Sequence, residues 1–147
     1  KIKVFKGDRG MIFIGIDTGT HTGVAVWNSE EKEFIDIKTL KLHQALQLVI
    51  TMCQIWKREN VMVLFEDARQ RKWFGRDADA KRMGAGYVKR DATIWEEFCT
   101  DYEIPFRAMP PAKGATKLEP DFFKALTGWK KRTSEHARDA AMIVFGR

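Results

Sequence analysis

The sequence predicts an α/β domain in which a mixed five-stranded sheet is flanked by helices. Three strand-like segments follow one another near the N-terminus, and from residue 42 onward helical and strand-like segments alternate. Strands joined by short turns pair antiparallel, whereas a strand reached through a helix returns parallel to its predecessor. We therefore expect three antiparallel strands followed by two parallel ones.

The first three strands are expected within the first forty residues. Residues 11–16 (MIFIGI) form an unbroken apolar run, and residues 22–27 (TGVAVW) resume after a turn rich in glycine and threonine, which predicts a hairpin. Residues 33–39 alternate apolar with polar side chains, as is typical of a strand near a sheet edge.

A helix is expected over residues 42–56, where apolar residues recur every three or four positions. Residues 61–65 (VMVLF) are all apolar, as in a strand buried on both faces. The helix is therefore expected to be the crossover that brings this strand to a central, parallel position in the sheet.

The second half of the chain predicts a loop over 69–75, a helix from about 77 to 102, a strand over 104–109 and helices over 121–126 and 134–145. On the first of these helices, Tyr87, Ile94, Phe98 and Tyr102 form an apolar stripe that we expect in the core. Trp95 falls outside this stripe and indicates a second apolar patch.

Composition favours one compact domain over residues 11–147, with residues 1–10 as a leader or remnant outside it. The 147 residues include 26 Lys+Arg and 20 Asp+Glu, and the net charge of +6 favours a polyanion such as nucleic acid as the partner. Two cysteines do not make a disulfide scaffold, which indicates a reducing, cytoplasmic location. Every apolar run is far shorter than the roughly 20 residues that span a bilayer, so no membrane partner is expected.

Carboxylates stand at the ends of two buried segments and inside the last helix. Asp17 follows the first strand, Glu66 follows the strand over 61–65, and Asp139 lies three residues after His136 on a shared helix face. Carboxylates held together in a rigid sheet need a cation between them, and Mg²⁺ prefers such oxygen ligands. Two Mg²⁺ ions, with Mn²⁺ able to substitute, would then support in-line hydrolysis of a phosphodiester.

Simpler explanations exist for each of these residues taken singly. A strand-terminal Asp often caps the following turn, and a helix His is usually structural. Asp67 competes with Glu66, but we prefer Glu66 because it directly follows the buried run, and we expect Asp67 to point to the opposite face. Asp17 is the strongest candidate, since the glycines of its GIDTGTHTG segment would let the backbone approach a phosphate closely.

Three segments together resemble the RuvC-type Holliday-junction resolvases of the RNase H-like superfamily. They are IGIDTGTHTGVAVW (14–27), VLFEDA (63–68) and SEHARDAAMI (134–143), and the resemblance extends over nearly the whole chain from Met11. It implies an RNase H-like fold, in which Asp17, Glu66, His136 and Asp139 are the catalytic and metal-binding residues.

The same resemblance implies a substrate and an assembly. The substrate would be a four-way DNA junction, which the enzyme would cut symmetrically during DNA recombination and repair. The enzyme would be a homodimer whose interface is built on the helix over 77–102. Its source could be cellular or viral. Lys113 and Lys117 would be phosphate-contacting lysines, since PAKGATKLEPDFFKAL resembles the lysine-bearing segment before the family's last helix. Family members often have Pro at the position of Thr18.

A basic stretch over residues 69–90 directly follows Glu66. It holds eight basic and two acidic residues, 8 − 2 = +6, which suits a DNA backbone, although a solvated helix face is the common alternative. Trp73 and Phe74 could stack on unpaired bases, unless one of them is buried in the core. The candidate DNA-binding residues here are Arg69, Arg71, Lys72, Trp73, Phe74, Arg76 and Lys81.

Three other functions are compatible with parts of the sequence. A YqgF-type RNA-processing nuclease shares the turn around Asp17 and is the main alternative. IGIDTGT also resembles the phosphate loop of the actin and sugar-kinase group, but that fold needs a second lobe for which 147 residues leave no room, so no nucleotide cofactor is expected. A non-catalytic DNA-binding domain is disfavoured, because binding an anion gains nothing from clustered acids.

Overall fold

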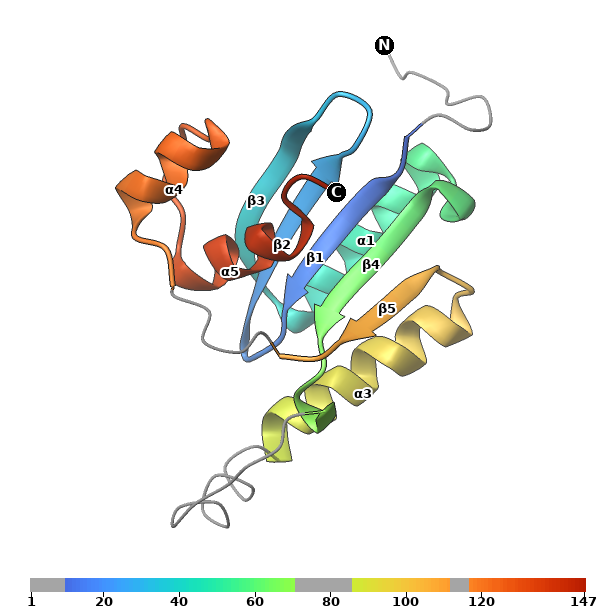
Figure 1. Cartoon of the computed structure of the whole chain (residues 1–147). Helices are drawn as coiled ribbons and strands as arrows, with labels where there is room; N and C mark the ends of the chain where they lie inside the picture. Colours follow the sequence, from blue (N-terminus) through green and yellow to red (C-terminus); the bar gives the residue numbers. More distant parts are fainter. Residues whose placement is uncertain (1–9, 71–85, 112–116) are drawn as a thin grey trace, which may run out of the picture.

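The computed structural model describes residues 10–70, 86–111 and 117–147 and contains the expected mixed sheet (Figure 1). Its strand order is β3-β2-β1-β4-β5. The first three strands pair antiparallel, and β4 and β5 continue the sheet in parallel, which confirms the predicted α/β architecture. The strands are β1 (Ile12–Asp17), β2 (His21–Asn28), β3 (Glu33–Lys41), β4 (Val61–Glu66) and β5 (Phe106–Met109).

The helices cover both faces of this sheet. They are α1 (Leu42–Trp56), α3 (Gly86–Asp101), α4 (Pro120–Thr127) and α5 (Glu135–Val144), with short 3₁₀ turns η1 (Arg58–Asn60) and η2 (Ala68–Gln70). In Figure 1, α1 and α5 lie on opposite faces of the strands. Two separate clusters of buried side chains, one on each face of the sheet, match this layering.

The predicted bounds of α1 are correct, and those of most strands lie within two residues of the observed bounds. Asp17 and Glu66 are the last residues of β1 and β4 rather than the first residues beyond them. β5 begins at Phe106, two residues later than expected, because the amide of Ile104 still bonds to the carbonyl of Cys99 and Pro105 has no N–H to give to the sheet. The start of the helix expected from residue 77 lies outside the described residues, as do residues 1–9 of the expected leader.

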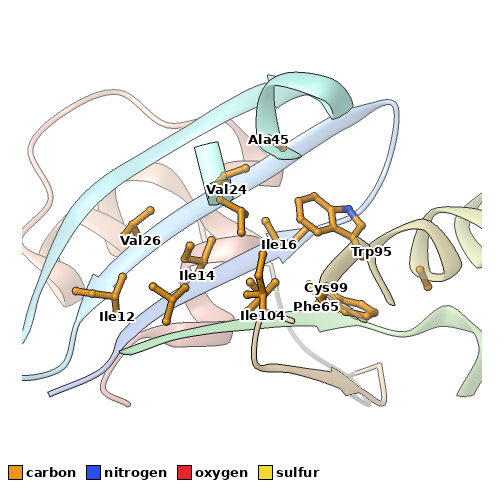
Figure 2. Packing of buried hydrophobic residues seen from close by; sticks show 14 residues of the cluster. Ile12, Ile14, Ile16, Val24, Val26, Ala45, Phe65, Trp95, Cys99 and Ile104 are labelled. Carbon is orange, nitrogen blue, oxygen red and sulfur yellow. The ribbon is translucent and has the colours of Figure 1, made fainter. Parts of the chain in front are cut away.

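The prediction for the buried face of α3 is correct only in part, since Phe98 packs against the core but Tyr102 does not. Trp95 is 0% exposed and lies in the core, whereas Tyr102 is 51% exposed and Phe98 is only partly buried. Ala92 and Cys99, one helical turn on either side of Trp95, are small and fully buried, which leaves room for the indole against the sheet. Figure 2 shows Trp95 beside Ile16 and close to Cys99 and Phe65, so this helix face is part of the core.

In the described parts of the chain, no helix is long and apolar enough to cross a membrane.

Candidate active site

The ends of β1 and β4 place two carboxylates side by side. These strands are adjacent and parallel, and Ile16 is in register with Phe65, so Asp17 and Glu66 occupy the next position on each strand. Ile16 and Phe65 belong to the cluster packed against α1 and α3. Because side chains alternate along a strand, Asp17 and Glu66 emerge on the opposite face, which α5 covers.

Two glycines allow α5 to rest directly on the backbone of the strands. A Cβ added at Gly23 would lie 2.0 Å from the carbonyl oxygen of His136, and one at Gly15 would lie 2.3 Å from that of Ala140. The role expected for this glycine-rich segment was close approach to a phosphate. At positions 15 and 23 the glycines instead admit the helix that carries His136 and Asp139.

The N-terminus of α5 is fixed by a side-chain cap. The Ser134 hydroxyl accepts a hydrogen bond from the amide of Ala137, 3.1 Å away, and it also contacts the hydroxyl of Thr39 on β3. These contacts set the first turn of α5 against the sheet, close to the strand ends that carry the carboxylates.

His136 meets Asp17 across this interface. Its Nδ1 lies 2.9 Å from Oδ2 of Asp17, whose side chain is 23% exposed, while the imidazole is half exposed. The contact brings together two of the residues that the sequence assigns to the site.

The pKa of Asp17 depends on burial and on the charged groups around it. Burial raises the pKa of Asp17, the hydrogen bond from His136 opposes that rise, and the negative charges of Asp139 and Glu66 add to it. Burial also raises the pKa of Asp139, and the nearby Lys117 ammonium works against it. The charges of Asp139 and Glu66 therefore both act on the Asp17 carboxyl group.

Asp67 belongs to a different structure. Its buried carboxylate pairs with Arg69, whose Nε lies 2.8 Å away, and this hydrogen bond above all lowers the pKa of Asp67. Arg69 also pairs with Glu96 on α3 at 2.5 Å. Asp67 therefore ties the end of β4 to the α3 side of the sheet, whereas Glu66 faces α5.

Of the expected DNA contacts, the structure describes Arg69 and Lys117. The Lys117 ammonium pairs with the carboxylate of Glu135, which raises its pKa, and the charges of Asp139 and Asp17 act in the same direction. The charge of Lys117 therefore interacts with those of Asp139 and Asp17. The remaining expected DNA contacts lie outside the described residues and stay predictions: Arg71, Lys72, Trp73, Phe74, Arg76, Lys81 and Lys113.

The carboxylates fit a divalent cation in their chemistry. Among the described side chains, no group of three or more His, Cys, Asp or Glu is arranged so that it could hold a metal ion as it stands. However, Asp17, Glu66 and Asp139 offer hard oxygen donors of the kind that Mg²⁺ prefers. Burial disfavours the charged forms of Asp17 and Asp139, and the charges of Asp139 and Glu66 disfavour that of Asp17 further, so a cation beside Asp17 would be stabilising.

Sequence reasoning missed two residues that shape this site. The nearly buried Arg138 donates from Nε to the carbonyl of Leu118 at 2.9 Å and from a terminal nitrogen to that of Thr133 at 2.8 Å. Glu135 pairs with Lys117. The only sign in the sequence that Arg138 belongs to the site is its position next to Asp139. Nothing in the sequence around Glu135 indicates that it pairs with Lys117.

Comparison with protein-family models finds no match for this chain, and comparison with curated proteins finds no significant match either.

Proposed function

We propose that this chain is a divalent-metal-dependent DNA endonuclease that resolves four-way junctions by hydrolysing phosphodiester bonds. One observation supports this most strongly. Asp17 and Glu66 end two adjacent parallel strands, and α5, seated closely on Gly15 and Gly23, carries Asp139 near enough for its charge to act on Asp17. Carboxylates gathered in this way are costly without a cation, and they suit a site that handles phosphate oxygens through Mg²⁺.

Asp17, Glu66 and Asp139 would hold the metal, which when bound supplies Lewis-acid activation of water and stabilises the leaving oxygen. His136 orients Asp17 through Nδ1. If Nδ1 carries the proton that Asp17 accepts, Nε2 is the basic ring nitrogen and can take a proton from water. Lys117 places a positive charge beside Asp17 and Asp139, where a phosphate would otherwise meet only negative charge.

The choice of DNA junctions as substrate rests on the resemblance to the resolvases and on the basic stretch after Glu66. A homodimer belongs to the same proposal, because a two-fold assembly would present two identical sites to two symmetric strands of a junction. Action in the cytoplasm is likewise part of the proposal.

The test is a cleavage assay on four substrates of matched length: a four-way DNA junction, linear duplex DNA, an RNA/DNA hybrid and a structured RNA, each with Mg²⁺ or Mn²⁺. We expect cleavage of the junction in preference to the others, at symmetric positions. Preferential cleavage of the RNA would favour the YqgF-type alternative. Cleavage of nothing, or of all four substrates equally, would overturn the proposal.

A further inference from the structure

We propose that a second cationic surface, distinct from the stretch after Glu66, binds the phosphate backbone of nucleic acid on the α5 side of the sheet. It consists of four side chains on α4 and on the segment that joins α4 to α5: Lys124, Lys130, Lys131 and Arg132. We call it the α4–α5 cationic surface. The inference rests on the proposed function for its choice of partner, but not for its geometry.

These four cations are available for a partner. All four are exposed, and within residues 10–70, 86–111 and 117–147 none of them forms an ion pair. Elsewhere in the described chain, Arg58, Arg69 and Lys117 are engaged by carboxylates.

The only acids close by in sequence lie at the two edges of this surface. Glu119 and Asp121 stand at the start of α4, and Glu135 is paired with Lys117. Four uncompensated positive charges in nine residues favour a polyanionic partner.

The segment that carries the cations is anchored at both ends. After α4, the amide of Gly128 bonds to the carbonyl of Lys124 at 2.8 Å, and the Trp129 ring packs edge-on against Phe34 of β3 at 6.3 Å. Lys131 lies over the Trp129 ring, 5.6 Å from its centre. A segment held in this way loses less conformational entropy when its cations contact a ligand, so it is suited to binding.

Arg138 closes the other end of the segment. Its guanidinium donates to the carbonyls of Thr133 and Leu118, so the residues before and after α4 are fastened to the middle of α5. The neighbouring residue on α5 is Asp139. The cationic segment and the carboxylate of Asp139 are therefore held by the same helix.

The surface lies on the same side of the sheet as the carboxylates. Arg132 precedes the helix cap Ser134 by two residues and His136 by four. Figure 1 shows α4 on the α5 side, away from α1 and α3. A partner with phosphates repeated along a chain can contact this surface and also present a phosphodiester to the carboxylates. This favours nucleic acid over an acidic protein or a membrane, although Phe122 and Leu126 are exposed on α4.

The test measures binding without cleavage. The intact chain and a variant with Lys130→Gln, Lys131→Gln and Arg132→Gln are titrated against a labelled DNA junction in EDTA at several salt concentrations. A plot of log Kobs against log salt has a negative slope. For duplex arms, this slope becomes shallower by about 0.9 for each phosphate that the protein no longer neutralises. We expect the slope of the triple variant to fall by about 2–3, with weaker binding at low salt.

The matched control is Lys57→Gln, a change of one exposed lysine at the end of α1, which packs on the other face of the sheet. Lys57→Gln should leave the salt slope and the affinity for the junction unchanged. A thermal unfolding curve of the triple variant that matches the wild type shows that its fold is retained. An unchanged slope in the triple variant, or an equal loss in the control, overturns the inference. So does a triple variant that loses binding to phosphatidylserine vesicles but not to DNA.

Failure of this inference differs from failure of the proposed function. Junction cleavage in Mg²⁺ together with an unchanged salt slope would leave the nuclease and remove the second surface. A reduced slope with no cleavage of any substrate would keep the surface and remove the nuclease.

Discussion

Nδ1 of His136 lies 2.9 Å from Oδ2 of Asp17, a contact between residues 119 positions apart. It joins the first turn of the last helix to the end of the first strand. The contact exists because Gly23 has no side chain to hold the backbone of His136 away from β2. A glycine in a strand thereby determines which groups surround the Asp17 carboxylate.

Replacing Asp17 with Asn should abolish metal-dependent cleavage while binding to the junction is retained. The amide keeps the size of the side chain and removes the charge that a cation needs. We expect the cleavage rate to fall by more than the roughly 10–100-fold typical of losing an outer partner of a metal site. Asp36→Asn, on β3 in a surface pair with Lys38, is the control and should cleave normally. Loss of binding as well as cleavage would indicate misfolding instead.

Gly23→Ala should destabilise the protein strongly. The added Cβ would lie 2.0 Å from the His136 carbonyl oxygen, so α5 would have to move away from the sheet. Overpacking of this kind typically costs about 1–3 kcal/mol in the free energy of unfolding, which urea denaturation measures. Gly86→Ala at the start of α3 is the control, because a Cβ there meets nothing within 4 Å. Equal stability of the two variants would contradict the close packing of α5.

Asp139→Asn should raise the melting temperature of the metal-free protein at neutral pH. Burial raises the pKa of Asp139 in the folded state, so its charged form destabilises the fold above the unfolded value of 3.8. The gain should shrink as the pH falls towards 3.8, where the unfolded chain also becomes protonated.

Magnesium should reverse this difference, because it stabilises the wild-type carboxylates more than the variant. Scanning calorimetry with and without Mg²⁺ measures both effects, and Glu97→Gln on the exposed face of α3 is the control. A wild-type melting temperature that Mg²⁺ leaves unchanged would count against cation binding here.

Cys99 should resist thiol reagents in the folded protein. It is fully buried, and this burial raises its pKa to about 12, so almost no thiolate is present at pH 8. Cys53 is only partly buried, and it should be the thiol that reacts first with a chromogenic disulfide reagent. Cys53→Ser should abolish the native-state reaction, and Cys99 should react only in denaturant. Rapid labelling of Cys99 in the native protein would contradict its place in the core.

The raised pKa of Cys99 also predicts lower stability in alkali. Above about pH 9 the thiol ionises in the unfolded chain but not in the folded one, so the free energy of unfolding decreases as the pH rises towards 12. Cys99→Ala should lose this part of the pH dependence, while Cys53→Ser should keep it, and denaturant titrations from pH 8 to 11 would measure the difference.

The sequence alone determined the elements and their order. Helical spacing over residues 42–56 gave α1 its bounds, and the apolar runs that end at Asp17 and Glu66 placed both acids at the ends of buried strands. This was possible because the period of apolar residues records which face of an element leaves water, and that information is local.

The tertiary structure decided which faces meet. The pairs Arg69–Glu96 and Lys117–Glu135 each join segments that are far apart in the sequence. The burial of Trp95 depends on the room left between α3 and the sheet. On α3 the small residues Ala92 and Cys99, rather than the longer apolar stripe, mark the buried side, because close packing against a sheet depends on shape as well as hydrophobicity. Shape complementarity between distant segments leaves no periodic trace in a single sequence, so only the folded chain reveals it.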